Sequence, residues 1–250
     1  MKYAWPAAIL GVLSLAAALR LPQLADRPMH ADEAVLADKF GTLLETGVYD
    51  YDPRDYHGPV LLYATLVPSR LRGIGRYADL DEQALRIVPV FFGLLVAAMP
   101  LLLVRALGRA EALAAAGLTA VSPAMVYYSR YYIPEMLLVC FLLGVIAFGY
   151  LYVRSGRAGW AILAGACLGL AFAAKETAAL AVLAMAAALA LTTRKLGDYR
   201  VLALGVGAAL VVFVLAITSF FREPGAVAEY IQAFAGYLGR GFGPGRHVHP

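Results

Sequence analysis

Charged residues are scarce in this chain. Only 15% of its 250 residues are charged, whereas 62% are hydrophobic, and the mean hydropathy is +0.72. Soluble globular domains carry about 25% charged residues. So little charge excludes an ordinary soluble domain and predicts an all-α polytopic membrane protein whose helices cross the bilayer several times.

Several other features are also missing from the sequence. The two cysteines, Cys140 and Cys167, lie inside apolar segments, where a thiol behaves as a small hydrophobe. No glycine-rich phosphate loop is present, which argues against ATP or a sugar nucleotide as substrate. The net charge of +4 comes without a basic stripe, so no nucleic-acid partner is predicted. No metal-ligand spacing is evident, and neither a metal nor another cofactor is expected.

Seven apolar stretches are long enough to be membrane spans. The first lacks a small-residue cleavage site at its end, so it is predicted to remain as an anchor. The stretch from 158 to 193 is divided into two spans, because a single helix of that length would reach about 50 Å, well beyond a core of roughly 30 Å. The predicted spans are residues 5–24, 86–104, 110–128, 135–153, 158–174, 177–193 and 201–221.

The basic residues predict the orientation of these spans. Arginine and lysine gather in the short loops that follow the second, fourth and sixth spans, which places those loops and the N-terminus in the cytoplasm. The protein is then expected in the cell (inner) membrane, with its chemistry on the extracytoplasmic side. The outside segments are the long stretch 25–85, the turns around Arg130 and Lys175, and the residues after about 221.

The acidic pair Asp32 and Glu33 lies a few residues beyond the first span and supplies the candidate catalytic residues. A carboxylate at the membrane surface can act as a base between a water-soluble acceptor and a lipid-borne donor. The residues after the pair have helical spacing, and Gly47 is placed to end that helix. In the alternative interpretation, Asp32 is an N-cap and Glu33 a first-turn acid favoured by the helix dipole.

His57 lies farther along the same outside loop, in an aromatic and acidic segment. It could position a hydroxyl, a phosphate or a metal, or it could be a turn residue beside Gly58. Pro59 at a helix start, followed by the short apolar run 60–67, predicts an interfacial helix on the outer surface.

Arg130 and Tyr131 lie in the outside turn between the third and fourth spans. Arg130 departs from the inside preference for positive charge, and a guanidinium matches phosphate oxygens in pairs. Tyrosine rings stack on sugar faces. The alternative interpretation is an aromatic belt at the membrane surface with an arginine that reaches the head groups.

Lys175 and Glu176 interrupt the apolar stretch between the fifth and sixth spans. Charged side chains in an apolar region cost about 2.5–3.5 kcal/mol each, and by default they mark function. The alternative is a pair that neutralises itself at a turn. Together with the other outside turns, these residues predict a site for a lipid phosphate and a polar acceptor.

At this point the chain resembles a known superfamily. The acidic pair, the Tyr-Ser-Arg turn at 128–130 and the stretch at 169–175 are similar to those of GT-C glycosyltransferases of the protein mannosyltransferase and aminoarabinose transferase type. A closer resemblance, to bacterial and archaeal membrane proteins labelled flippase-associated, rests on four segments: 30–33, 55–59, 127–130 and 174–177.

The resemblance implies a polyprenyl-phosphate sugar as donor and transfer outside the membrane to a lipid, glycan or protein acceptor. Asp32 is then the base, and Lys175 with Arg130 binds the donor phosphate. His57, Tyr131 and Glu176 complete the implied substrate-binding set.

The implied fold is a GT-C-like N-terminal transmembrane bundle with a long first extracytoplasmic loop that carries interfacial helices. Two departures from the pattern of the relatives stand out. Glu176 occupies a position where many relatives have glycine, and the chain stops at residue 250 without a further span. We therefore expect residues 1–250 to be an N-terminal portion of such a protein.

Two other functions compete with transfer. A non-enzymatic partner in the translocation of lipid-linked glycans also needs a phosphate site, but only a transferase needs a base at Asp32. An ion-coupled transporter with Lys175 and Glu176 as its relay is disfavoured, because the charges gather at one membrane face instead of crossing the midplane.

Overall fold

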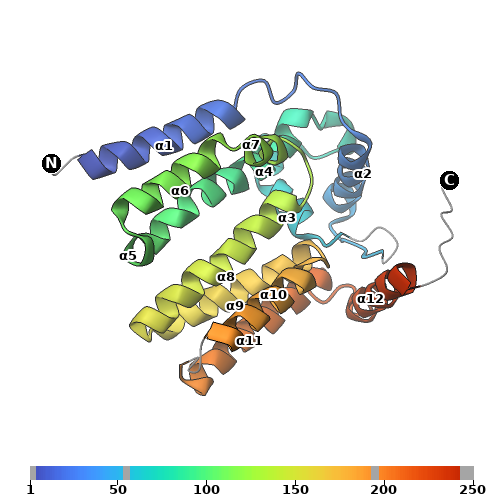
Figure 1. Ribbon diagram of the computed structural model, residues 1–250. Helices are drawn as coiled ribbons and strands as arrows, with labels where there is room; N and C mark the ends of the chain where they lie inside the picture. The colour runs from blue at the N-terminus through green and yellow to red at the C-terminus, as the bar shows by residue number, and fades with distance from the viewer. Residues whose placement is uncertain (1–3, 53–56, 193–196, 243–250) are drawn as a thin grey trace.

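The computed structural model describes residues 4–52, 57–192 and 197–242, and within them all regular structure is helical (Figure 1). The prediction of an all-α fold is therefore confirmed. The first seven α-helices are α1 (Ala4–Arg20), α2 (Ala31–Thr46), α3 (Val60–Leu71), α4 (Glu82–Ala98), α5 (Val104–Leu107), α6 (Arg109–Val121) and α7 (Pro123–Ser129). The remaining ones are α8 (Glu135–Ser155), α9 (Ala158–Ala174), α10 (Ala178–Thr192), α11 (Tyr199–Ile217) and α12 (Ala226–Phe242). Two 3-10 segments, η1 (Tyr77–Asp79) and η2 (Met99–Leu103), complete the set.

Each predicted span overlaps a helical segment of the structure, with ends that differ by a few residues. Three segments are long and apolar enough to cross a bilayer, and they are Glu82–Leu107, Glu135–Ser155 and Tyr199–Ile217. Helices α6 and α7 together make a fourth if the pair, bent by 59°, is one span. Helices α1, α9 and α10 are apolar but shorter, with 17, 17 and 15 residues. The count of seven crossings stays a prediction.

Helix α2 has the predicted end and a different beginning. Gly47 ends it in the left-handed region, at φ 74°, with its N–H bonded to the carbonyl of Leu43. Its N-cap, however, is His30, whose Nδ1 accepts from the backbone N–H of Asp32, while the Glu33 side chain accepts from the N–H of His30. The interpretation of Asp32 as N-cap was therefore wrong, because the N-cap lies two residues earlier, at His30.

Helices α8, α9 and α11 lie side by side and form the tightest part of the bundle (Figure 1). Small residues allow this approach. A Cβ on Gly165 would lie 1.9 Å from the carbonyl oxygen of Gly205, and one on Gly169 would lie 2.4 Å from that of Ala209. Backbone-to-backbone contact of this kind is the usual way in which membrane helices pack without a hydrophobic driving force.

The fully buried side chain of Arg20 joins the end of α1 to the break between α6 and α7. Pro123 has no N–H, so the carbonyl of Thr119 one turn earlier has no helical donor. The Arg20 guanidinium donates to Thr119 O at 3.2 Å and to Ala120 O at 2.8 Å. Its Nε donates to Ser129 Oγ at 3.2 Å, which fixes α7 to α1.

The crossing prediction can be tested by cysteine accessibility. In a background with Cys140 and Cys167 replaced by alanine, single cysteines are introduced as Arg157→Cys, Thr177→Cys and Tyr199→Cys. A membrane-impermeant maleimide added to intact cells should label only Thr177→Cys, because two crossings separate positions 157 and 199. All three should react after permeabilisation. Labelling of Tyr199→Cys in intact cells would contradict the seven-span topology.

Candidate active site

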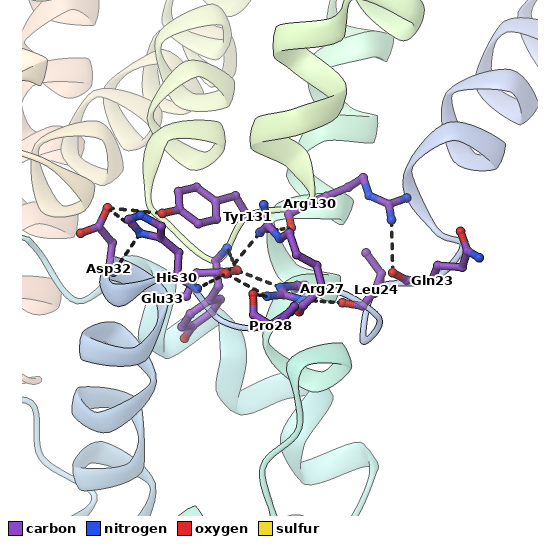
Figure 2. A network of polar contacts seen from close by, with 11 residues as sticks. Gln23, Leu24, Arg27, Pro28, His30, Asp32, Glu33, Arg130 and Tyr131 are labelled. Atoms are coloured by element: carbon purple, nitrogen blue, oxygen red, sulfur yellow. Dashed lines mark hydrogen bonds and ion pairs between the residues drawn. The ribbon is translucent and has the colours of Figure 1, made fainter.

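The carboxylate of Glu33 is the centre of a buried polar network at the start of α2 (Figure 2). Arg86 of α4 holds it with two bonds, Nε to Oε1 at 2.8 Å and Nη2 to Oε2 at 2.8 Å. The backbone N–H of Tyr132 donates to Oε1 at 2.9 Å and that of His30 to Oε2 at 3.1 Å. Arg27 Nη2 adds a bond to Oε2 at 3.2 Å. One carboxylate thus joins the first loop, α4 and the turn before α8.

Arg86 also closes the loop between α1 and α2. Its Nη1 donates to the carbonyls of Leu24 at 2.6 Å and Arg27 at 2.7 Å, and its Nη2 donates to Pro28 O at 3.2 Å. Only 2% of its side chain is exposed. Since an unpaired guanidinium or carbonyl in such a place is costly, these bonds stabilise the observed conformation of the loop.

Glu33 positions the groups that donate to it, on Arg86, Tyr132 and His30. Burial by itself raises the pKa of Glu33, but the bonds from Arg86 and from two backbone amides lower the pKa below its ordinary value. The group is therefore ionised at neutral pH, and its oxygens are occupied by donors from the protein. The sequence grouped Glu33 with Asp32 as catalytic, and the structure gives the two carboxylates opposite surroundings.

Asp32 lies in the first turn of α2 with 67% of its side chain exposed. Its Oδ2 accepts a hydrogen bond from the hydroxyl of Tyr131 at 3.3 Å. Burial and the neighbouring Asp32 carboxylate raise the pKa of Tyr131 to about 12, so this hydroxyl keeps its proton at neutral pH. The ring of His30 packs edge-on against Tyr131. Asp32 is thus oriented by a phenol and still open to solvent.

Lys175 and Glu176 point to different partners. Lys175 Nζ donates to Glu135 Oε1 of α8 at 2.6 Å. Glu176, with 1% exposed, accepts from the hydroxyl of Tyr51 at 2.6 Å. The interpretation of a self-neutralising pair at the turn was therefore wrong, because adjacent side chains leave an extended backbone in opposite directions. Burial and the Glu176 carboxylate raise the pKa of Tyr51 well above its ordinary value, which keeps that hydroxyl a donor.

Asp32, His57 and Lys175 line one pocket of about 310 Å³. They come from α2, from the segment before α3 and from the end of α9, so the fold gathers three of the sequence-predicted residues in one place. Val35, Leu36, Lys39, Ile133 and Glu135 complete the lining. Among the described residues, no three His, Cys, Asp or Glu side chains gather closely enough to hold a metal ion.

Gly58 fixes the position of His57 beside Lys175. Its N–H donates to the carbonyl of Ala174 at 3.2 Å, at the very end of α9. A Cβ at this position would lie 1.9 Å from the carbonyl oxygen of Ala173. Only glycine permits this close approach. The approach brings the segment of His57 against the end of α9, so that His57 and Lys175 line the same pocket.

Arg130 lies outside that pocket. Its guanidinium donates to the carbonyls of Leu19, Arg20 and Gln23 at 3.2 to 3.4 Å, at the end of α1. In Figure 2 it extends to the side of Tyr131 opposite Asp32. The structure therefore separates Arg130 from Lys175, with which the sequence had grouped it. The Tyr-Ser-Arg turn connects α7 to the end of α1, since Ser129 accepts the hydrogen bond from Arg20 described above.

Sequence reasoning missed three arginines that organise the site. Arg20 and Arg86 lie at the edges of apolar segments, where they looked like ordinary flanking charges, and Arg27 was one of several charges in a long loop. The available signal was a charge within a predicted span, since Arg20 lies inside the span 5–24 and Arg86 begins the span 86–104. The cost of a charge in an apolar segment was weighed only for Lys175 and Glu176.

Removal of the Glu33 charge should destabilise the protein strongly. Glu33→Gln leaves Arg86 buried without a counter-charge, which costs about 3–5 kcal/mol. The melting temperature in detergent micelles should fall by about 6 °C or more. Asp79→Asn is the matched control, since Asp79 pairs with the exposed Arg76 and such surface pairs contribute about 0–1 kcal/mol. Equal melting temperatures for the two variants would contradict the central role of Glu33.

Gly58→Ala should separate the His57 segment from α9. The added methyl group cannot occupy a space 1.9 Å from a backbone oxygen, so the segment must shift, at about 1–3 kcal/mol. Gly75→Ala is the control in the same long loop, because a Cβ there meets nothing within 4 Å. Thermal unfolding should show a lower melting temperature for Gly58→Ala alone. A melting temperature equal to that of Gly75→Ala would contradict the close approach of Gly58 to the end of α9.

The fold of the chain is similar to that of much larger proteins. It aligns with an oligosaccharyltransferase of Archaeoglobus fulgidus in the apo form at TM-score 0.67 and 15% identity, over 97% of this chain and 34% of that one. The archaeal oligosaccharyltransferase AglB of Archaeoglobus fulgidus, in complex with an inhibitory peptide and a dolichol-phosphate, aligns at TM-score 0.66 and 16% identity, over 98% of this chain and 35% of that one.

A third similar structure is the protein O-mannosyltransferase Pmt1-Pmt2 complex of S. cerevisiae bound to the sugar donor. The TM-score is 0.62 at 17% identity, over 95% of this chain and 34% of that one. This chain thus spans about a third of the length of these structures. No curated protein matches it in sequence.

The sequence model of one family, described as dolichyl-phosphate-mannose-protein mannosyltransferase, matches residues 69–217. The match begins near the end of α3 and runs to the end of α11, so it covers more than half of the chain. The resemblance to GT-C proteins is confirmed by this match and by the similar folds. The chain belongs to the dolichyl-phosphate-mannose-protein mannosyltransferase family, within the GT-C membrane glycosyltransferases.

Proposed function

We propose that this protein transfers a sugar from a polyprenyl-phosphate donor to an acceptor on the extracytoplasmic face of the membrane. The observation that carries the proposal is the pocket of about 310 Å³ that holds Asp32, His57 and Lys175 together. It offers a solvent-accessible carboxylate to one substrate and a cation to another. That combination suits a reaction in which one substrate loses a proton and the other leaves as an anion.

Asp32 is the proposed base. It takes the proton from an acceptor hydroxyl or amine while the acceptor atom forms a bond to the anomeric carbon of the sugar. The bond from that carbon to the phosphate oxygen breaks, and the prenyl phosphate leaves with the electron pair. A single displacement of this kind inverts the configuration at the anomeric carbon. Tyr131 orients Asp32, and Glu33 fixes the start of the helix that carries it.

Lys175 is the proposed partner of the donor phosphate, with His57 beside it. In the structure Lys175 forms an ion pair with Glu135. When the donor binds, its phosphate replaces the Glu135 carboxylate as the partner of Lys175. Glu135 and Lys175 are only partly buried, which leaves room for that exchange. Glu176 does not contact the donor in this proposal; it accepts a hydrogen bond from Tyr51 and holds that side chain.

An apolar groove along α9 is the proposed path of the prenyl chain. A groove of about 320 Å³ runs between α9, α11 and α12 and is lined by Phe172, Leu210 and Ile231 among others. Phe172 precedes Lys175 by three residues, or about 4.5 Å along the helix axis. We propose that the prenyl chain of a donor held at Lys175 follows α9 past Phe172 into the membrane core.

The similar structures support a lipid-linked donor. One of them holds a dolichol-phosphate together with an inhibitory peptide, and another holds the sugar donor. The family match is to a mannosyltransferase that uses a dolichyl-phosphate sugar. We propose a lipid, glycan or protein as acceptor.

The second proposal is a partner in translocation of lipid-linked glycans. It uses the same phosphate site at Lys175 and gives no task to an exposed carboxylate beside it. The orientation of Asp32 by a neutral tyrosine hydroxyl favours the transferase, because a general base needs a fixed direction toward its proton.

Asp32→Asn should abolish most of the turnover with little effect on stability or donor binding. Asn keeps the shape and hydrogen-bonding atoms, but it cannot take the proton, so the rate should fall about 10²-fold or more. The helix cap is provided by His30 and is unaffected. Release of prenyl phosphate from prenyl-phosphate sugars by the intact protein is the measurement. Asp38→Asn, on an exposed part of the same helix, should keep the parent rate. A parent-like rate for Asp32→Asn would eliminate the base assignment.

Lys175→Ala should weaken donor binding, whereas Lys175→Arg should retain most of it. Loss of a charge-assisted hydrogen bond costs about 1.5–3 kcal/mol, which weakens the affinity for the donor about tenfold or more. Glu135→Gln is the informative companion, because it removes the competing carboxylate and should bind the donor at least as tightly as the parent. Binding of a non-hydrolysable prenyl-phosphate analogue measures this order. Equal affinities for Lys175→Ala and the parent would remove Lys175 from the donor site.

A further inference from the structure

A second pocket, of about 180 Å³, lies beside the candidate active site and is lined by three arginines. We call it the arginine pocket. Its lining residues are Gln23, Leu24, Arg27, Arg86, Tyr127 and Arg130. Neither the proposed transfer reaction nor the donor site uses this space.

The charges of the arginine pocket are only partly neutralised. In the part of the chain that the structure describes, Glu33 is the only carboxylate paired with any of the three guanidinium groups, and it serves both Arg86 and Arg27. Arg130 is bonded to neutral carbonyls. Three cations against one anion leave a formal charge of about +2. A pocket with this surplus attracts an anion.

The N–H donors of the arginine pocket suit a ligand with several oxygens. Arg86 has its donors in use, but within the described residues Arg27 bonds only through Nη2, to Glu33 and to the carbonyl of Arg130. The Arg27 guanidinium lies over the rings of Tyr127 and Tyr131, at 5.6 and 5.0 Å from their centroids, which holds its plane in place. A fixed guanidinium with unused N–H groups matches the geometry of a phosphate.

The arginine pocket is distinct from the pocket of Asp32 and Lys175. Tyr131 stands between the two, with its hydroxyl on Asp32 and its ring under Arg27. In Figure 2 the Asp32 and Arg130 side chains lie on opposite sides of that ring. At about 180 Å³ the pocket is smaller than the 300–1,000 Å³ typical of sites for larger ligands, so it suits a phosphate and not a sugar with its phosphate.

The surroundings indicate that the phosphate belongs to a lipid. The pocket lies where α1 ends, and α1 is one of the apolar helices. Tyr127 and Tyr128 beside it are 51% and 42% exposed, as in the aromatic belts that mark the level of lipid head groups. Basic pockets between membrane helices are known to bind the phosphate groups of anionic lipid head groups.

We infer that the arginine pocket binds the phosphate of a membrane lipid, on the same membrane face as the candidate active site and separately from the donor. The site holds its phosphate without transferring it. Because Arg27 belongs to the loop between α1 and α2 and Arg130 donates to Gln23 O of the same loop, an occupied pocket also stabilises the segment that leads into Asp32.

The test uses the intact protein in maltoside micelles, titrated with dihexanoyl phosphatidate and, separately, with inorganic phosphate. Arg27→Gln and Arg130→Gln should each bind phosphatidate about tenfold or more weakly, since each loses a charge-assisted contact. Arg76→Gln is the matched control, because Arg76 is an exposed arginine between α3 and α4 that pairs with Asp79 outside the pocket. It should bind like the parent. Equal losses in all three variants, or in none, would overturn the inference.

Two further comparisons separate a local site from a folding defect. Arg130→Lys keeps the charge and should retain most of the phosphatidate affinity, whereas a purely structural role would make it fail like Arg130→Gln. Asp32→Asn and Lys175→Ala should bind phosphatidate as the parent does, so failure of the proposed transfer reaction leaves this result intact. Inorganic phosphate should bind at least tenfold more weakly than phosphatidate. Equal affinities for the two probes would overturn the assignment to a lipid.

Discussion

The buried ion pair between Glu33 and Arg86 is the interaction on which the rest of the site depends. Two charges removed from water are stable only when hydrogen bonds saturate them, and here the pair also takes in backbone groups from two separate segments. That requirement fixes where α2 begins and how the turn before α8 sits against it. Asp32 and Tyr131 are each next in sequence to a residue of this network, so their positions follow from it.

The pocket itself is assembled by polar contacts between distant parts of the chain. Lys175 reaches Glu135, Glu176 reaches Tyr51, and Gly58 bonds to the end of α9. Near a membrane, polar groups with no partner are expensive, so each contact removes a cost and at the same time places a reactive group. The Lys175–Glu135 pair has a further consequence: the cation offered to a donor is already held in place by a carboxylate.

Much of the fold could be predicted from the sequence, because the lengths of apolar stretches determine membrane helices and Gly47 marks a helix end with a simple steric signal. The partners of the charges could not. Lys175 and Glu176 are adjacent, yet the direction in which each leaves the backbone depends on the turn between α9 and α10. Arg130 was grouped with Lys175 because both were predicted on the same side of the membrane. Two residues on the same side can still lie far apart along the membrane surface. Arg86 was overlooked because a buried partner is invisible in a sequence.

The central claim is that the chemistry and the donor phosphate belong to the pocket of Asp32 and Lys175, while the arginines beside it hold a different group. The most direct measurement is an experimental structure of the intact protein with a bound prenyl phosphate. The account predicts density for the phosphate within hydrogen-bonding distance of Lys175 Nζ, with Glu135 displaced and the chain along α9. A prenyl phosphate held by Arg27 and Arg130, with the Lys175–Glu135 pair intact, would contradict it.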